Sequence, residues 1–337
     1  NHEAWYFGIG WIGDGLRMQW PDFAGTSRRI GFDLVATHPS GWVNPALESG
    51  ALTLDQLRNA ADPAVFFPES RSLAELRRAG FKIMMNYSPF HVVNWRFKND
   101  REYRCLGAEK GIHDSWCMSY AGKYRQMEID AIVASYEAIG GAELVMFDTE
   151  LFGTSYQAAL NCTRCRQAFA ASGMSDFRQY FVREVARFFG ETVQAVKAVA
   201  QRRNWPEPRF ALYGITGKVF GSHGFITVGD LPGIDIQSPS LYVGNHPAEI
   251  ARGVSEAVGA SALPVMPWLT TATYGYVTPV NCKIMVWENF VNGARGGVYY
   301  QASDLNPAQL HAIAEAMAAL RPHAAILQHG RPASDEF

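Results

Sequence analysis

Short apolar runs alternate with longer amphipathic stretches along most of the chain. The short runs predict β-strands, and because they are apolar on both faces they are typical of a parallel sheet that helices cover on each side. Alternation of such strands with helices indicates βα units. The predicted strands are residues 5–10, 30–36, 81–86, 144–148, 210–214, 234–238, 263–268 and 297–301.

The amphipathic stretches carry recognisable helix signals. Ser72 and Glu75 have the spacing of a capping box, so a helix is expected to begin there and to end near Gly80. Gly140 and Gly141 end another helix, because glycine readily adopts the left-handed conformation common after a helix C-terminus. The predicted amphipathic helices are residues 126–139, 176–203, 247–258, 280–292 and 307–320.

Eight strands alternating with helices predict a (β/α)8 barrel of the α/β class, formed by residues 1–337 as a single domain. Long loops are expected after the first strands, because residues 11–29 and 37–68 are irregular in pattern. The alternative is a doubly wound open sheet, which normally carries a glycine-rich phosphate turn after its first strand. The segment that starts at Gly8 matches G-x-G-x-x-G, but the bulky Trp11 and the lack of a clear following helix argue against a nucleotide site.

Composition narrows the class of partner. Hydrophobic residues make up 48% of the chain and charged residues only 18%, which suits a large buried core. The 30 basic and 32 acidic side chains nearly cancel, so neither nucleic acid nor an anionic membrane surface is an expected partner. No apolar run reaches the roughly 18 residues that a membrane-spanning helix needs.

The fourth predicted strand ends in two carboxylates, Asp148 and Glu150. Side chains two apart on a strand share a face and lie roughly 6.5 to 7 Å from each other along it. Two carboxylates this close cannot easily both ionise, so one is expected to keep its proton near neutral pH, as a general acid must. The alternative is a pair of salt-bridged or helix-capping acids at the start of a loop, although the apolar neighbours Phe147, Leu151 and Phe152 make an unpaired charge costly there.

Polar and aromatic residues follow the other predicted strands as well. In a (β/α)8 barrel the active site forms at the carboxyl ends of the strands, so these side chains are expected to line its mouth. Flat aromatic faces can stack on sugar rings, while amides, hydroxyls and carboxylates bind sugar hydroxyl groups, so we expect a carbohydrate substrate. The candidate substrate-binding residues are Trp11, Asp14, His38, Asn86, Tyr87, Tyr213, Gln237, Tyr242, Trp268, Tyr300, Gln301 and Asp304.

Acids at the end of the fourth of eight strands resemble those of the barrel glycoside hydrolases. The Asp-x-Glu ending is similar to that of the chitinase-like family 18 enzymes, although Leu144, Val145 and Met146 stand where those enzymes carry further aspartates. This resemblance implies that Glu150 is the general acid and that Asp148 is its electrostatic partner, which helps the acetamido group of the substrate to attack.

The predicted seventh strand ends without an acid, unlike the strand that carries the nucleophile in the large clan of retaining barrel enzymes. The nearest later glutamate, Glu288, falls in a predicted helix and is interpreted as a helix residue. An inverting mechanism stays open, with Asp14 or Asp304 activating water.

Five cysteines are present, and four of them fall in neighbouring predicted loops. Cys162 and Cys165 form a C-x-x-C pair after the fourth strand, and Cys105 and Cys117 follow the third, so the four thiols can converge on a tetrahedral zinc ion. Two disulfides or four reduced thiols are the alternatives. The arrangement resembles the cysteine–zinc cluster of family 42 β-galactosidases, which implies a structural metal, whereas Cys282 is expected to be a buried helix residue.

These patterns together predict an enzyme that hydrolyses a glycosidic bond without a catalytic cofactor. No H-x-x-x-H or H-x-H pair supports a catalytic metal, although a metal-dependent hydrolase stays an alternative. A barrel that binds glycans without cleaving them is the other alternative. Barrel folds host many chemistries, so the function must be argued from the site.

Overall fold

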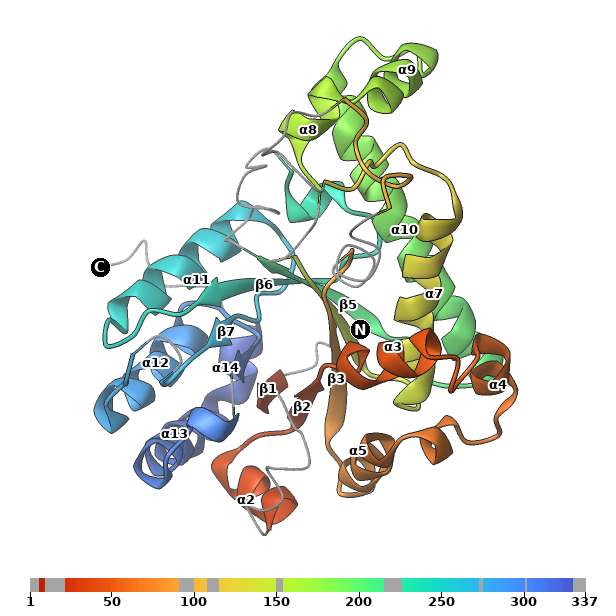
Figure 1. The fold of residues 1–337 in the computed structure, drawn as a ribbon. Helices are drawn as coiled ribbons and strands as arrows, with labels where there is room; N and C mark the ends of the chain where they lie inside the picture. Colours follow the sequence, from red (N-terminus) through yellow and green to blue (C-terminus); the bar gives the residue numbers. More distant parts are fainter. Residues whose placement is uncertain are drawn as a thin grey trace.

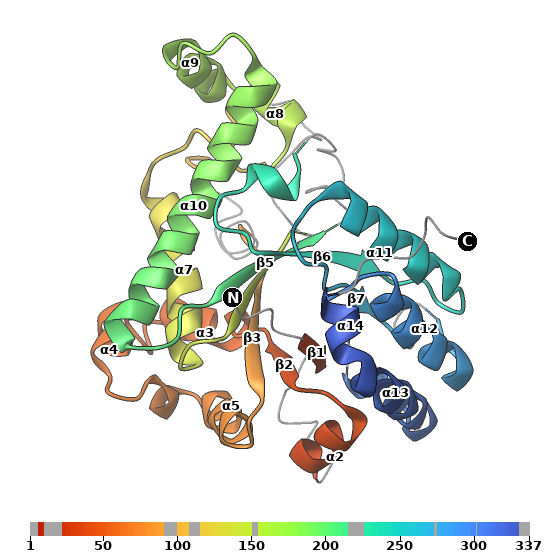
Figure 2. The same ribbon diagram turned by 180° about the vertical axis from the view of Figure 1, so that it is seen from behind.

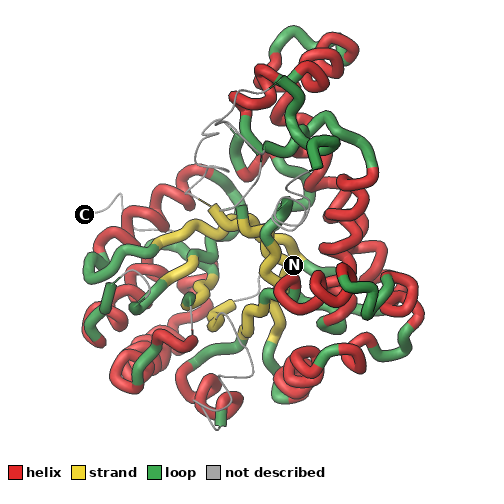
Figure 3. The backbone as a smooth tube through the Cα atoms, in the orientation of Figure 1, coloured by secondary structure: helices red, strands yellow, loops and turns green. Residues whose placement is uncertain are grey.

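A computed structural model of the chain describes residues 6–9, 22–90, 100–107, 115–149, 154–214, 226–272, 275–300 and 302–329. Within them, eight parallel strands follow one another in chain order and close into a barrel, because β1 pairs with both β2 and β8 (Figures 1 and 3). The predicted (β/α)8 barrel is thereby confirmed. The strands are β1 (Tyr6–Ile9), β2 (Leu34–Thr37), β3 (Lys82–Tyr87), β4 (Leu144–Asp148), β5 (Arg209–Gly214), β6 (Ile236–Leu241), β7 (Trp268–Leu269) and β8 (Gly296–Tyr299).

Helices surround the barrel, and the views from front and back show them on its outside (Figures 1 and 2). Helices α8 and α9 lie at one end of the long helix α10 and project away from the barrel. None of the helices described combines the length and the apolar character needed to cross a bilayer. The helices are α2 (Phe23–Ile30), α3 (Ser40–Glu48), α4 (Leu54–Asn59), η1 (Pro63–Phe66), α5 (Pro68–Arg78), α7 (Lys123–Ala138), α8 (Tyr156–Asn161), α9 (Thr163–Ala171), α10 (Phe177–Arg203), η3 (Val228–Asp230), α11 (Ala248–Ala260), α12 (Pro279–Val291), η4 (Ala302–Asp304), α13 (Pro307–Leu320), η5 (Arg321–His323) and α14 (Ala324–His329).

Several element boundaries differ from the sequence prediction, the seventh strand most, and two of the differences have a clear local cause. The second strand begins at Leu34 rather than at residue 30, because Asp22 caps α2 and the left-handed Gly31 ends it. Helix α5 begins at Pro68 in its first turn, so Ser72 lies inside the helix and the predicted capping box is not its start.

The strands separate two apolar layers, as alternation along a strand requires. One side chain in two packs inside the barrel, and the others pack between the sheet and the helices in the larger core. The interior layer consists of Tyr6, Leu34, Ala36, Met84, Leu144, Met146, Ala211, Tyr213, Ile236, Met266, Trp268 and Val298, with Tyr242 and Tyr300 packed against it.

Three acidic residues lie at the amino-terminal end of the barrel, and each directly precedes an even-numbered strand. Each carboxylate accepts a hydrogen bond from a backbone N–H of the strand before it, so the acids extend the ladder between paired strands. The pairs are Asp33 with Phe7 N at 2.8 Å, Glu143 with Ile83 N at 2.7 Å and Asp235 with Phe210 N at 2.8 Å.

Candidate active site

Asp148 ends β4 and belongs to the interior face of the barrel. Leu144 and Met146, four and two residues earlier on the same strand, are interior core residues, and alternation places Asp148 with them. Phe147 faces the opposite way and packs against Phe189 and Phe210 outside the sheet. Asp148 is half-buried, whereas Glu150 lies outside the described residues. The strand therefore carries one of the two predicted acids into the interior at the carboxyl end.

Four of the predicted substrate-binding residues form one continuous group of rings, which we call the aromatic wall. Tyr213, Trp268, Tyr300 and Tyr242 come from β5, β7 and the ends of β8 and β6. The centroid of the Trp268 ring lies 6.2 Å from Tyr213 and 6.0 Å from Tyr300, and Tyr300 lies 6.0 Å from Tyr242. The structure therefore brings together residues that lie up to 87 positions apart in the sequence. They occupy the side of the barrel from β5 to β8.

The members of the aromatic wall differ in accessibility. Trp268 is 2% exposed and Tyr213 is 6% exposed, whereas Tyr242 and Tyr300 are half-buried. The Trp268 indole N–H donates to the Met146 sulfur at 3.1 Å, and the Tyr213 hydroxyl donates to Ser240 Oγ at 2.9 Å. Trp268 and Tyr213 are thus supporting residues of the interior, and the rings that a ligand can reach are Tyr242 and Tyr300.

Two predicted mouth residues face away from the interior, so these two predictions are wrong. The Gln237 amide donates to the carbonyls of Ala257 and Leu263, at 2.7 and 3.1 Å, on the helix side of the sheet. Tyr87 is fully buried on the same outer side, where burial and the nearby Glu128 raise the pKa of its hydroxyl. Tyr87 was predicted together with its neighbour Asn86, although adjacent side chains on a strand point to opposite faces. Gln237 is the second residue of β6 and does not lie at its carboxyl end.

When the alternation of the strands is taken from the structure, other residues of β3 and β6 face the interior. Asn86 precedes Tyr87 and belongs to the interior face of β3, where its side-chain oxygen is buried without a hydrogen bond from the residues described. Ser240, which the sequence prediction missed, shares a face with Ile236 on β6 and accepts from Tyr213. The sequence signal that could have identified Ser240 is its spacing of four residues from Ile236, an interior position.

The remaining candidates are two residues that follow strands and three that the structure does not describe. His38 follows β2, and its Nδ1 lies 2.9 Å from Ser40 Oγ. Asp304 ends the short helix η4 after β8, with Ser303 Oγ donating to it at 3.4 Å. Both lie at the carboxyl side of their strands, as predicted for mouth residues. Trp11, Asp14 and Gln301 lie outside the described residues.

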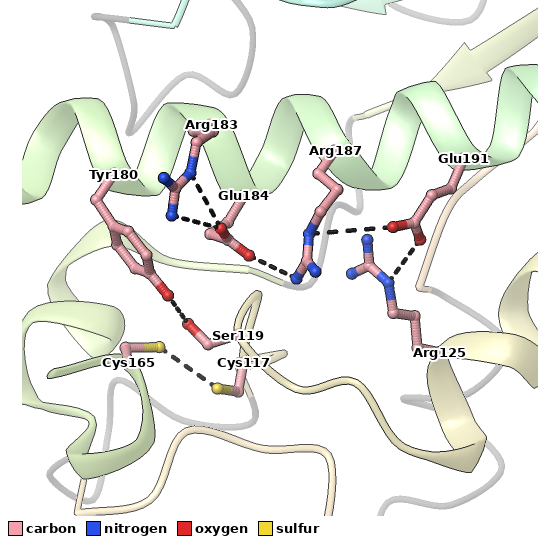
Figure 4. Close-up of polar contacts among 9 residues, drawn as sticks. All are labelled: Cys117, Ser119, Arg125, Cys165, Tyr180, Arg183, Glu184, Arg187 and Glu191. Carbon is pink, nitrogen blue, oxygen red and sulfur yellow. Dashed lines mark hydrogen bonds and ion pairs between the residues drawn. The ribbon is translucent and has the colours of Figure 1, made fainter. Parts of the chain in front are cut away.

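The four predicted cysteines converge into one cluster. Cys105, Cys117, Cys162 and Cys165 place their sulfur atoms within 4.8 Å of one another, and no other such group of metal-ligating side chains occurs in the described ranges. The Cys117 sulfur lies 3.4 Å from that of Cys165 (Figure 4). It lies 3.8 Å from that of Cys162. A disulfide requires about 2.05 Å, whereas four thiolates at about 2.3 Å from one zinc ion lie roughly 3.8 Å apart. The geometry fits zinc better than disulfides.

The cysteine cluster joins the connection after β3 to the connection after β4. The backbone N–H of Leu106 donates to the Cys162 sulfur at 3.2 Å, and Thr163 N donates to Leu106 O at 2.9 Å. Ser119, two residues after Cys117, hydrogen-bonds the Tyr180 hydroxyl of α10 at 2.7 Å (Figure 4). The cluster is therefore held against α10 as well.

A row of charges lies on α10 beyond the cluster. The nearly buried Glu184 binds both Arg183 and Arg187, and Arg125 Nε of α7 donates to Glu191 at 2.8 Å (Figure 4). Of these ion pairs, that of Arg125 with Glu191 joins α7 to α10, whereas those of Glu184 lie within α10. The helices that carry the two connections are thus held together independently of the thiols.

Comparison with known proteins identifies the fold but no family. No protein-family model matches the chain, and no curated protein is significantly similar to it in sequence. The catalytic domain of a β-amylase from Paenibacillus polymyxa is similar in structure, with a TM-score of 0.58 and 9% identity, over 94% of this chain and 98% of that one.

Two further solved structures share the fold. A β-galactosidase from Rahnella sp. R3 has a TM-score of 0.61 and 11% identity; 97% of this chain matches 57% of that one. A class V chitinase from Nicotiana tobaccum has a TM-score of 0.55 and 10% identity, over 93% of this chain and 99% of that one. At these identities the likeness shows the (β/α)8 barrel alone.

Proposed function

We propose that this chain is a glycoside hydrolase in which Glu150 is the general acid and Asp148 is its electrostatic partner. The observation that carries the proposal is the place of Asp148, at the carboxyl end of β4 and on the interior face of a closed barrel. Glu150 follows two residues later in the sequence, which is the spacing at which side chains of a strand share a face. The reachable rings of Tyr242 and Tyr300 supply a surface on which a sugar can stack.

The structural neighbours support the class of reaction. A β-amylase, a β-galactosidase and a chitinase share this barrel, and each is named for a glycosidic substrate. Active sites of such barrels form at the carboxyl ends of the strands, where Asp148 and the aromatic wall lie. The sugar and its anomer do not follow from a likeness of this kind.

The proposed chemistry needs one proton and one water molecule. Protonated Glu150 donates to the glycosidic oxygen as the bond to the anomeric carbon breaks, and Asp148 stabilises the positive charge that develops on the sugar. Water then adds to that carbon, and the proton it releases restores the acid. Assistance by a substrate acetamido group, and inversion with Asp14 or Asp304 as base, are the two routes compatible with a strand-seven segment that lacks an acid.

Glu150→Gln tests this assignment against a glycan-binding barrel. In the enzyme, the variant loses about 10²- to 10⁴-fold in kcat on a responsive aryl glycoside or polysaccharide, while affinity for the same sugar is kept. Glu288→Gln is the matched control, because Glu288 lies in α12 and accepts a hydrogen bond from Asn292. Full activity of Glu150→Gln would refute the assignment. If the wild type binds a glycan but cleaves none of a broad substrate panel, the binding-module alternative holds.

We also propose that the four cysteines bind one structural zinc ion between the connections that follow β3 and β4. The sulfur separations support this, as does the tetrahedral thiolate coordination that zinc prefers. Metal analysis of the purified protein should find one zinc per chain, and Cys165→Ser should lose it. If the protein is instead a metal-dependent hydrolase, the Cys165→Ser variant should keep an activity that a chelator abolishes.

A further inference from the structure

Two threonines hold the two ends of the segment that contains Glu150. The Thr149 hydroxyl donates to the carbonyl of Tyr213 on β5, and the Thr154 hydroxyl donates to the carbonyl of Trp116 at 3.0 Å. Both threonines are nearly buried, at 5% and 7% exposure. The first bond ties the segment to the barrel. The second ties it to the antiparallel pair of residues 103–105 and 115–117, which we call the cysteine hairpin; in it Cys105 N donates to Ser115 O and Cys117 N donates to Tyr103 O.

Trp116 occupies the centre of that hairpin and has no exposed surface. Its ring packs against Phe90, just after β3, at 4.5 Å and against Tyr103 at 5.0 Å. Its carbonyl accepts from Thr154 and also lies 3.8 Å from the Cys105 sulfur. A change in the cysteine cluster therefore acts directly on the atom to which Thr154 is bonded.

Phe90 supports the ring of Trp116 on the side away from the cysteines. It has a left-handed backbone with φ of 65°, which is unfavourable for a residue with a side chain. Its N–H donates to the buried Glu128 carboxylate at 2.8 Å, and its ring packs against Phe188 of α10 at 4.2 Å. The ring of Trp116 thus packs on a residue that is itself held by Glu128 and Phe188, and the side of Trp116 toward the cysteines is the part that metal binding can change.

We propose that Thr154 is a positioning residue, through which the four-cysteine site fixes the downstream end of the segment that contains Glu150. The inference rests on the proposed zinc site, and its effect on catalysis rests on the proposed hydrolase. Zinc holds Cys105 and Cys117 together, the backbone pairing of these two segments places the Trp116 carbonyl, and that carbonyl accepts from Thr154. Because coupling is reciprocal, loss of the Thr154 hydroxyl must also weaken zinc binding.

The test compares Thr154→Val with Thr149→Val. Each variant removes one hydroxyl at nearly constant shape, but only the first bond ends on the cysteine hairpin. Zinc affinity is measured by competition with a chelator, and amide hydrogen exchange is followed for residues 154–158 with and without zinc. Thr154→Ser keeps the hydroxyl and serves as the rescue variant.

We expect Thr154→Val to lower zinc affinity by about threefold to tenfold and Thr154→Ser to restore it. In the zinc-loaded protein Thr154→Val should speed exchange at residues 154–158, and zinc removal should add little to this increase. Thr149→Val should leave zinc affinity unchanged. Under the proposed hydrolase, Thr154→Val should lower kcat more than it raises KM.

Unchanged zinc affinity in Thr154→Val, or exchange effects of that variant and of zinc removal that simply add, would overturn the proposal. A protein that binds no zinc would overturn it together with the metal site. If no glycoside is cleaved, the affinity and exchange measurements still decide the link between Thr154 and the cysteines, so that result counts only against the hydrolase.

Discussion

The two ends of the barrel both carry carboxylates, and their surroundings differ. At the amino-terminal end, Asp33, Glu143 and Asp235 each accept a backbone N–H of the neighbouring strand. At the carboxyl end, Asp148 shares the interior with the half-buried rings of the aromatic wall. Glu143 directly precedes β4 and Asp148 is its last residue, so residue type alone does not identify a catalytic site. The end of the strand and the face of the side chain distinguish a structural acid from a candidate catalytic one.

Asp148→Asn should give the largest effect that separates the two ends. Under the proposed hydrolase, loss of this charge should lower kcat by about 10²- to 10³-fold, with little change in the free energy of unfolding. Steady-state kinetics and urea denaturation on the same preparation measure both quantities. A variant that unfolds more easily yet keeps its kcat would place Asp148 among the structural acids.

Glu143→Ala should have the opposite profile. Its carboxylate is the acceptor for Ile83 N–H, so removal leaves a buried donor without its partner and should lower the free energy of unfolding by about 1 to 3 kcal/mol. The kcat of the folded molecules should stay unchanged. Glu143→Gln keeps an acceptor oxygen and is the matched control, for which denaturant titration should show a smaller loss.

Tyr300→Ala should affect binding at the carboxyl end without large loss of stability. Tyr300 is a half-buried ring of the aromatic wall, and loss of one stacking surface should raise KM by about threefold to tenfold. Tyr300→Phe keeps the ring and should retain most of the affinity. Equal losses in both variants would mean that the hydroxyl, rather than the ring face, contacts the sugar.

Tyr136→Phe should give the smallest effect at neutral pH, and its effect on stability should become visible only at alkaline pH. Burial raises the pKa of Tyr136 to about 12 beside the amino-terminal end of β4, whereas the unfolded tyrosine ionises near 10. A raised folded pKa means that the contribution is fully present below pH 10 and is lost as pH rises toward 12. This one group therefore gives a slope of about 1.4 kcal/mol per pH unit in that window.

Denaturant unfolding at several alkaline pH values checks the Tyr136 prediction. Tyr136→Phe should show a shallower loss of stability than the wild type, while the activity at neutral pH stays the same. Identical pH dependence of the two proteins would contradict the prediction.

The periodicity of the sequence was sufficient for the barrel and for the thiol cluster. β4 was predicted with its observed bounds, since its apolar run is sharply limited by Gly141 and Asp148. The convergence of the cysteines followed from the adjacency of consecutive loops in a barrel. These features depend on local pattern and on topology, and both can be inferred from the residues.

The features that the sequence did not predict correctly depend on which face of a strand each residue occupies and on tertiary contacts. A strand end is known only to within a residue or two, and an error of one residue exchanges Gln237 for a neighbour on the other face. The hydrogen bonds of Asp33 and Asp235 join segments that only the folded sheet brings together. No pattern within either segment indicated them.

The carboxylate bonds at the amino-terminal end also divide the barrel into pairs. They join β1 to β2, β3 to β4 and β5 to β6, each through one acid that precedes the even strand. A chain divided between β2 and β3, or between β4 and β5, keeps all three bonds within its pieces. A break between β3 and β4 separates Glu143 from its donor. Two-strand modules are therefore the natural units for split-protein reassembly and for exchange of segments between barrels.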